Sequence, residues 1–441
     1  MNLALPQKVQ HILSILNDRG HKAYAVGGCI RDSLLGKAPQ DWDITTSAPP
    51  EEILSAFPKT VPTGLKHGTV TVLAGGESFE VTTFRIDGVY ENHRSPESVT
   101  FTEDIREDLA RRDFTVNAMA YHPGEGFVDP FGGRQDLSLG LLRAVGDPET
   151  RFDEDALRIL RAFRFSAQTG FSIEENTLAA AAKMAPLLSS VSAERIRDEL
   201  LKILLSDRPG ILSQMDDLGV LPLILPEFSA LRGVTQNTKY HVFDVFDHSL
   251  RVIENVPKTP VLRLAALLHD TGKPAKKTTD DKGTDHFYGH PAVSTTLAEA
   301  VLLRLKLDNK TIAQVKTLVA HHDYRFAETA HSVRKLASRV GQELFLPLLS
   351  LMRADAMGQN PALLSERLAH YERIEALYQT ILADGDALSL ADLAISGNDL
   401  LAAGYRGKEI GNALARALEL VLLDPKENEK EILLKKLKNP D

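Results

Sequence analysis

The sequence predicts an α+β protein, with a small mixed α/β head at its N-terminal end followed by mostly helical segments. Runs rich in β-branched and aromatic residues, which are typical of strands, cluster within the first 85 residues. From residue 152 onward, apolar residues recur at helical spacing almost to the end of the chain. With 441 residues, the chain is long enough for two to four domains with ample core.

A glycine pair follows the first predicted strand, the apolar run from Tyr24 to Val26. At Gly27 and Gly28 the backbone can turn tightly and leave room for a phosphate group. A short helix is expected over residues 30–35, so Arg31 lies in its first turn beside free backbone N–H groups. Because these groups and a guanidinium attract anions, the segment predicts a triphosphate site.

Two aspartates one residue apart follow in a predicted strand over residues 41–44. Since side chains alternate along a strand, Asp41 and Asp43 share one face, where their charges repel unless a cation lies between them. Mg²⁺ is the usual cation, and the pair predicts attack on a nucleotide α-phosphate assisted by two metal ions. The alternative is a solvated turn with a helix-capping aspartate. Glu80, in a predicted hairpin over residues 68–85, is either a third carboxylate or a solvated strand residue.

These residues resemble the head of a known family. The pattern GG-x-x-RD-x-LLG followed by DWDITT is similar to class II tRNA nucleotidyltransferases and the related bacterial poly(A) polymerases, within the DNA polymerase β-like superfamily. The resemblance implies a polymerase β-like nucleotidyltransferase head that uses CTP and ATP with Mg²⁺. Residues 86–99 mix glycine, proline and charges without a period, so we expect a mobile loop there. By resemblance, this loop helps to change nucleotide choice during the addition cycle.

A second stretch that resembles the family runs from Arg111 to Ala118, within residues 107–121, whose periodicity predicts a helix. An Arg-Arg-Asp cluster can bind a triphosphate through its arginines and a ribose hydroxyl through its aspartate. The resemblance assigns Arg112 to the phosphates, Asp113 to the ribose 2′-OH and Asn117 to support of the site. An ordinary salt-bridged helix face is the alternative.

A predicted helix over residues 152–165 has acids in its first turn and arginines at three-residue steps. Asp155 and Arg158 then lie on adjacent turns of one face, where they offer an acceptor and donors to the pairing edge of a cytosine or adenine. This pair resembles the family's EDxxR motif, an amino-acid template that replaces a nucleic-acid template. Arg161 and Arg164 could contact phosphates. The competing interpretation is a solvent-facing helix whose charged residues only compensate the helix dipole.

A separate set of histidines and aspartates occupies residues 241–355. Their order resembles the HD domain of metal-dependent phosphohydrolases, and imidazole with carboxylate suits Mn, Fe, Co or Ni, and sometimes Mg²⁺. By that match, the ligands of one metal are His248, His269, Asp270 and Asp355. A second metal or a phosphate could bind at His290, His321 and His322. Structural histidines, or a scaffold under the RNA without turnover, are the alternatives.

Composition narrows the range of partners. A formal net charge of −9 argues against a protein that coats nucleic acids in general. An RNA partner would therefore need a local basic surface on this acidic chain. Cys29 is the single cysteine, which excludes an intrachain disulfide and fits a reducing cytoplasm. No apolar run approaches the roughly 18 to 20 residues of a membrane span, and the N-terminus has the pattern of an amphipathic helix rather than a signal peptide. We therefore expect a cytoplasmic protein without a membrane or DNA partner.

These expectations combine into one hypothesis for the chain. We expect a nucleotidyltransferase head over residues 1–143, a base-selecting helical neck over 144–226, an HD metal-binding domain over 227–365 and a helical tail over 366–441. The resemblance implies extension of tRNA 3′ ends to CCA from CTP and ATP, with the tail binding the tRNA acceptor and elbow. The alternatives are an enzyme that adds only CC or only A, a poly(A) polymerase, an HD phosphohydrolase with a vestigial head, and a noncatalytic RNA-binding protein.

Overall fold

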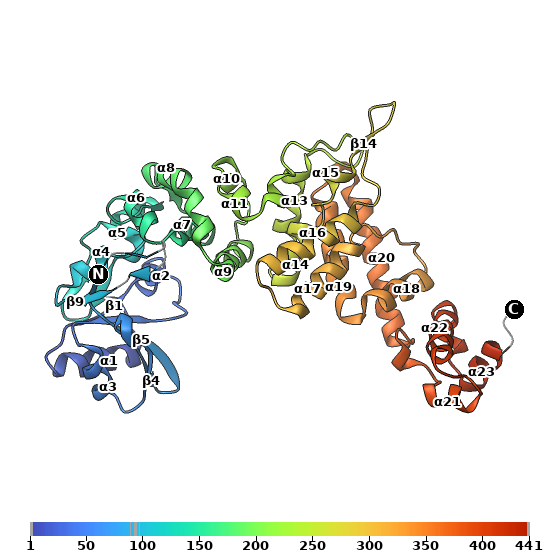
Figure 1. Ribbon diagram of the computed structural model, residues 1–441, viewed down its shortest axis with the longest axis horizontal. Coiled ribbons are helices and arrows are strands. Elements are labelled where there is room, and N and C mark those ends of the chain that lie inside the picture. Colours follow the sequence, from blue (N-terminus) through green and yellow to red (C-terminus); the bar gives the residue numbers. More distant parts are fainter. Residues whose placement is uncertain (1–2, 89, 92–94, 97, 439–441) are drawn as a thin grey trace. The chain divides into compact units, whose positions relative to one another are not determined.

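A computed structural model describes residues 3–88, 90–91, 95–96 and 98–438. The chain forms two compact units, Met1–Ile224 and Leu225–Asp441. The first contains a mixed sheet with helices, and the described part of the second is helical apart from one short hairpin, which confirms the predicted α+β class (Figure 1). Among the described residues, no helix combines the length and the apolar character that crossing a membrane requires.

The first unit is built on a seven-stranded sheet. In spatial order its strands are β11 (Gly126–Val128), β10 (Ala120–His122), β1 (Ala23–Val26), β2 (Asp43–Thr46), β5 (Glu77–Thr83), β4 (Thr69–Ala74) and β3 (Thr60–Gly64). Neighbouring strands are antiparallel except β2 and β5, which are parallel. Apolar residues of α1 (Gln7–Asp18) and α3 (Pro50–Ala56) share one core with Ile44 and Val81 of the sheet. The predicted hairpin is present as β4 and β5.

The predicted strand, glycine turn and helix are present, with shifted bounds. Gly27 has a φ of 84°, in the left-handed region that favours glycine, and helix α2 spans Gly28–Leu34, two residues earlier than expected. Strand β2 begins at Asp43, so the prediction of a strand from Asp41 was wrong. The reason is that β1 ends where the chain turns at Gly27, and its last residue, Val26, pairs with Asp43.

The predicted helix over residues 107–121 was also wrong. This segment contains the end of α4 (Ile105–Ala110), the 3₁₀ turn η2 (Thr115–Asn117) and the start of β10. The chain leaves the helix after Arg111, and Phe114 is extended because its backbone forms a β-bridge with Ala144. The Arg-Arg-Asp cluster therefore lies in a connection and not on a helix face.

The segment predicted as a mobile loop has partly regular structure. Strand β6 (Arg85–Asp87) pairs with β9 (Val99–Phe101), and the two-residue strands β7 (Tyr90–Glu91) and β8 (Ser95–Pro96) pair with each other. The absence of a strand pattern was therefore misleading for these residues. Residues 89, 92–94 and 97 of the predicted loop lie outside the described residues.

The helical segment after the sheet contains α6 (Pro148–Glu154), α7 (Leu157–Thr169), α8 (Glu175–Met184) and α9 (Ala193–Leu204). The single helix expected over residues 152–165 is broken at Asp155, which has extended φ and ψ of −142° and 101°. Its carboxylate accepts the backbone N–H of Leu157 at 3.1 Å, and its carbonyl oxygen accepts the N–H of Arg158. Asp155 thus favours the start of a new helix over continuation of α6.

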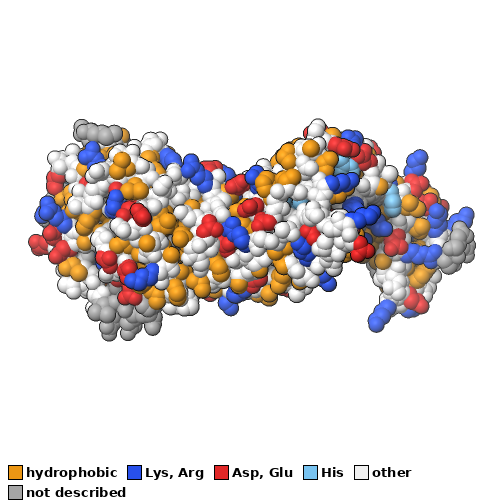
Figure 2. All heavy atoms as spheres, turned by 90° about the horizontal axis from the view of Figure 1, so that it is seen from above, with side chains coloured by type: hydrophobic (Ala, Val, Ile, Leu, Met, Phe, Trp, Pro, Cys, Tyr) orange, Lys and Arg blue, Asp and Glu red, His pale blue; other side chains and the backbone are white. Residues whose placement is uncertain are grey.

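The second unit consists of packed helices (Figure 1). Its main helices are α13 (Val245–Asn255), α14 (Pro260–Leu268), α16 (His290–Arg304), α17 (Asn309–His321), α18 (Ala330–Val340), α19 (Gln342–Met357) and α20 (Leu364–Ala383). At the C-terminal end, α21 (Gly397–Ala402), α22 (Lys408–Leu423) and α23 (Lys430–Lys438) share a small core of their own. On the face seen in Figure 2, basic and acidic side chains are intermingled.

Candidate functional site

The glycine turn brings two arginines together. A Cβ on Gly27 would lie 2.9 Å from Nη1 of Arg112, so a side chain there would displace this guanidinium. Arg31 lies beside the same turn, because its Nη2 is 3.7 Å from the position of a Cβ on Gly28. The two arginines predicted to bind phosphate therefore meet at the start of α2, where free backbone N–H groups also favour an anion.

Three carboxylates gather beside this turn. The parallel pairing of Ile44 with Val81 places Glu80 of β5 next to Asp43 of β2. Burial raises the pKa of Asp43, the positive charge of Arg112 opposes the shift, and the negative charges of Glu80 and Asp41 add to it. Glu80 and Asp41 thus each lie within electrostatic reach of Asp43. Mg²⁺ fits such a donor set, because its charge would relieve the repulsion and carboxylate oxygens are its preferred ligands.

Asp108 is a buried aspartate that the sequence reasoning did not single out. It connects strand β2 to Arg111 and Arg112. Oδ1 of Asp108 accepts hydrogen bonds from Nε and Nη2 of Arg111 at 3.0 and 2.7 Å. Its Oδ2 accepts the hydroxyl of Thr45 at 3.1 Å and lies 3.5 Å from Nη2 of Arg112. Burial would raise the pKa of Asp108, but the two arginines outweigh it and lower the pKa. The i, i+3 and i, i+4 spacing to the arginines was the available sequence signal.

Asp113 and Asn117 form a buried network with two arginines. Nη1 of Arg31 donates to Oδ1 of Asn117 at 2.6 Å, and Nδ2 of Asn117 donates to Oδ1 of Asp113 at 3.1 Å. Oδ2 of Asp113 accepts Nε and Nη2 of Arg161 at 2.7 and 2.5 Å. Burial would raise the pKa of Asp113, but Arg161 and Asn117 outweigh it and the pKa is lowered. The network therefore links the glycine turn to helix α7.

Asp155 and Arg158 each have a different charged partner. Oδ2 of Asp155 lies 2.8 Å from Nη2 of Arg195, which comes from α9. Nη1 of Arg158 lies 2.6 Å from Oε2 of Glu154, and its Nη2 donates to the backbone carbonyl of Arg111 at 2.9 Å. The expectation that the pair shares adjacent turns of one helix was wrong, because Asp155 precedes α7. Sequence reasoning did not pair Arg195 with Asp155, which lies 40 residues away.

The remaining predicted phosphate ligand, Arg164, faces away from solvent. Its Nε lies 3.1 Å from Oε2 of Glu199 of α9, and both side chains are buried. Burial lowers the pKa of Arg164 to about 10, and nearby Arg161 adds to the shift while Glu199 opposes it. The guanidinium remains charged at neutral pH, and its ion pair holds α7 against α9.

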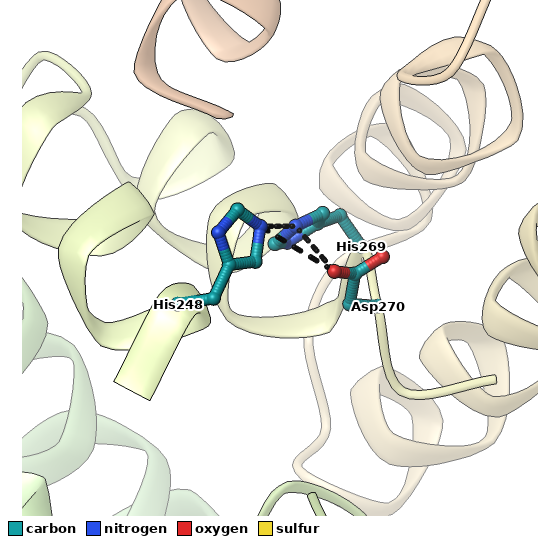
Figure 3. A group of neighbouring side chains, drawn as sticks. All are labelled: His248, His269 and Asp270. Carbon is teal, nitrogen blue, oxygen red and sulfur yellow. Dashed lines mark hydrogen bonds and ion pairs between the residues drawn. The ribbon is translucent and has the colours of Figure 1, made fainter. Parts of the chain in front are cut away.

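The second unit contains the predicted group of histidines and aspartates. Nε2 of His248 lies 3.4 Å from Nε2 of His269 and 3.0 Å from Oδ1 of Asp355. Oδ2 of Asp270 lies 3.5 Å from Nε2 of His248 and 3.2 Å from Nε2 of His269. Figure 3 shows the two rings and the Asp270 carboxylate pointing toward one another. The four predicted ligands of one metal therefore converge, although they come from distant parts of the second unit.

Hydrogen bonds orient the rings of this cluster. Nδ1 of His248 lies 3.0 Å from the carbonyl oxygen of Gly358, and Nδ1 of His269 lies 2.8 Å from that of Ala266. A carbonyl oxygen only accepts hydrogen bonds, so Nδ1 of each ring is the donor, and in a neutral imidazole of this tautomer Nε2 is the nitrogen that can bind a metal ion. Metal-binding histidines typically have this arrangement, in which the second nitrogen is anchored by a backbone oxygen.

Asp270 also faces a second pair of histidines. Its Oδ1 lies 3.3 Å from Nε2 of His290 and 3.6 Å from Nε2 of His322. Their Nδ1 atoms lie 2.9 and 2.7 Å from the carbonyl oxygens of Phe287 and Val319. The two oxygens of Asp270 thus belong to two neighbouring groups of ligand atoms. His321 instead directs Nδ1 at the carbonyl of Thr317 and, within the described chain, joins neither group.

Three family models match the chain. The poly(A) polymerase head domain matches residues 23–143, the probable RNA- and SrmB-binding site of polymerase A matches residues 170–231, and tRNA nucleotidyltransferase domain 2 matches residues 291–437. The fold and the acid cluster therefore define a nucleotidyltransferase. The HD resemblance is not among these matches, so the histidine cluster stands on its geometry.

Relatives identify the family more closely. The CCA-adding enzyme of Enterococcus faecalis is 35% identical over 429 residues, which cover 96% of this chain and 93% of that protein. The CCA-adding enzyme of Geobacillus thermodenitrificans is 50% identical over 198 residues, 45% of this chain and 49% of that protein. The crystal structure of Bacillus stearothermophilus CCA-adding enzyme in complex with CTP superimposes with a TM-score of 0.72 at 29% identity, covering 98% and 96% of the two chains. The chain belongs to the CCA-adding enzymes, the class II tRNA nucleotidyltransferases.

Proposed function

We propose that this chain completes the CCA sequence at tRNA 3′ ends from CTP and ATP and releases pyrophosphate. The observation that carries the proposal is the grouping of Asp41, Asp43 and Glu80 beside a glycine turn that Arg31 and Arg112 flank. It lies in a head whose family polymerises nucleotides, in a chain similar to CCA-adding enzymes over nearly its whole length.

Each part of this grouping has a chemical role in nucleotidyl transfer. Asp41 and Asp43 would hold Mg²⁺, which supplies charge stabilisation for attack of the terminal 3′-OH on the α-phosphate. Arg31, Arg112 and the N–H groups at the start of α2 bind the β- and γ-phosphates and favour departure of pyrophosphate. Glu80 adds negative charge that strengthens cation binding at Asp43.

Base selection is assigned to Asp155 and Arg158. A carboxylate oxygen and guanidinium N–H groups match the acceptors and donors of a cytosine or adenine edge. Because Arg195 and Glu154 already bind these two side chains, an incoming base competes with them or binds to the free positions that they orient. Arg195 and Glu154 therefore contribute to the choice between nucleotides.

Asp113 has less freedom to bind a ribose hydroxyl. Its two oxygens accept four hydrogen bonds, from the backbone N–H of Phe114, from Asn117 and twice from Arg161. A ribose contact needs one of these bonds to open. We assign Asp113 and Asn117 chiefly to the orientation of Arg31 and Arg161, and Arg161 and Arg164 to the positive field around the phosphates.

The decisive experiment uses tRNA that lacks one, two or three 3′ nucleotides, with CTP, ATP or both. Complete CCA addition requires that each tRNA is restored to the CCA end and then extended no further. Addition of only CC, or only of the terminal A, would assign a partial enzyme. Long A-tails on unrelated RNA would assign a poly(A) polymerase. In this scheme the helices of the tail bind the tRNA acceptor and elbow by shape and phosphate contacts.

We infer a second activity, metal-dependent phosphohydrolysis, for the histidine and aspartate cluster. The convergence of four Nε2 atoms on the two oxygens of Asp270 supports one or two bound divalent metals of the Mn, Fe, Co or Ni type, or Mg²⁺. Lys273, whose Nζ lies 2.6 Å from Oδ2 of Asp270, adds a buried positive charge that suits a phosphate group. His269→Ala should abolish this hydrolysis and spare CCA addition, whereas Asp43→Ala should do the reverse.

A further inference from the structure

Three arginine side chains of the candidate site converge on one aromatic ring, that of Phe165. The guanidinium carbon of Arg164 lies 3.9 Å from the ring centroid, that of Arg31 lies 5.0 Å away and that of Arg161 lies 5.2 Å away. Arg31 comes from the head helix α2, whereas Arg161 and Arg164 come from the neck helix α7. Phe165 is therefore the shared neighbour of two elements that are distant in sequence.

Hydrogen bonds through Asn117 and Asp113 link Arg31 to Arg161, but no described polar partner binds all three arginines. Arg31 binds Asp32 and Asn117, and Arg161 binds Asp113. Arg164 pairs with Glu199 on another helix. Each guanidinium thus has its own oxygen partner, and the Phe165 ring is the group that all three contact.

The ring also has a fixed orientation. Phe114, which belongs to the Arg-Arg-Asp segment, meets it in an edge-to-face arrangement, with centroids 5.8 Å apart and planes at 81°. Phe165 is 7% exposed and Phe114 is fully buried, so neither ring has freedom to turn away. A substitution of Phe165 would therefore alter the packing of three arginines and of Phe114, which lies in the same segment as Arg112.

The Phe165 ring can offset the repulsion among the three guanidinium groups around it. Three positive charges around one site repel one another, and the repulsion from Arg161 and Arg31 contributes to the lowered pKa of Arg164. The face of a phenylalanine ring carries partial negative charge and attracts guanidinium groups. An aliphatic residue of similar size would fill the space but would not offset this repulsion.

We propose that Phe165 is a positioning residue for nucleotide binding, whose ring holds Arg31, Arg161 and Arg164 at the spacing that an incoming triphosphate needs. The inference rests on the proposed function, because it takes Arg31 as a phosphate-binding group and Arg161 and Arg164 as a source of the positive field around the phosphates. Phe165 itself is buried beneath the guanidiniums and acts through them.

The test compares Phe165→Leu with Phe163→Leu in the full-length enzyme on tRNA lacking its terminal nucleotides. Phe163 is fully buried on the same helix and has no guanidinium over its ring among the described residues, so it controls for lost packing. Phe165→Leu should raise KM for CTP and ATP about tenfold, the equivalent of one or two cation–π contacts, and change kcat by less than about twofold. Phe163→Leu should lower the melting temperature without this rise, and Phe165→Tyr should restore KM.

Three outcomes would overturn the inference: an unchanged KM in Phe165→Leu, an equal rise in Phe163→Leu, or no rescue by Phe165→Tyr. If Phe165→Leu does not fold, Phe165→Met replaces it, because methionine fills similar space without a ring. Arg31→Ala separates this inference from the proposed function. If Arg31→Ala leaves KM for both nucleotides unchanged, the assignment of the arginines fails. If it raises KM while Phe165→Leu does not, the role of Phe165 alone fails.

Discussion

Replacement of Asp108 by asparagine tests whether the buried carboxylate positions the phosphate-binding arginines. Asp108 is fully buried, accepts two hydrogen bonds from Arg111 and one from Thr45, and lies 3.5 Å from Arg112. Asparagine keeps the size of the side chain but removes the buried negative charge that faces Arg111 and Arg112, while Asp87 remains 3.9 Å from Nη1 of Arg111. Breaking a buried ion pair in this way costs about 3 to 5 kcal/mol. For a unit of this size, a loss of about 3 kcal/mol corresponds to a melting temperature roughly 6 to 12 °C lower.

Calorimetry of the full chain measures the stability, and single-nucleotide addition measures KM for CTP and ATP. Asp104→Asn is the matched control, because Asp104 caps the same helix α4 from an exposed position and asparagine caps equally well. We expect Asp108→Asn to lower the melting temperature and raise KM for both nucleotides, and Asp104→Asn to change neither. Equal melting temperatures for the two variants, or an unchanged KM in Asp108→Asn, would refute the reasoning.

Three further predictions follow from the geometry. Arg195→Ala should free the carboxylate of Asp155 and reduce discrimination against UTP by about 5- to 10-fold. The measurement is the ratio of the kcat/KM values with CTP and with UTP. An unchanged ratio would show that Arg195 has no role in base selection. Asp113 has a lowered pKa in the folded chain, so its contribution to stability is fully present above its unfolded pKa of about 3.9 and is lost as the pH falls toward the folded value. The difference in melting temperature between wild type and Asp113→Asn should therefore be constant near pH 7 and shrink progressively as the pH falls below about 4. A difference that stays constant below pH 4 would contradict this. His248→Ala should lower the bound divalent metal measured by mass spectrometry, with CCA addition retained; an unchanged metal content would exclude His248 as a ligand.

Local sequence signals were sufficient where neighbouring residues decide the structure. The glycine pair at Gly27 and Gly28 predicted the turn, and the β-branched runs predicted the hairpin of β4 and β5. The HD order predicted four metal ligands, His248, His269, Asp270 and Asp355, and the structure brings their side-chain atoms together. These patterns are readable from the sequence because backbone freedom, strand alternation and ligand chemistry are properties of the residue types themselves.

The predictions failed where a distant contact overrides a local pattern. The helix expected over residues 107–121 ends early because Phe114 pairs with the backbone of Ala144. The helix expected over residues 152–165 breaks because the side chain and carbonyl of Asp155 cap α7. Helical periodicity does not reveal a cap in the middle of a charged run. The partners of charged residues, such as Arg195 for Asp155, depend on tertiary packing that spacing alone does not encode.

The most direct measurement of the central claim is the length and sequence of the product that Asp43→Asn forms on tRNA without its CCA end, compared with wild type. If the acids beside the glycine turn hold the metals for nucleotidyl transfer, wild type adds three nucleotides in the order C, C, A. The variant should then be slower by at least about 10²- to 10³-fold while its melting temperature stays near that of wild type. Product formation by Asp43→Asn at the wild-type rate would contradict the assignment of catalysis to this cluster.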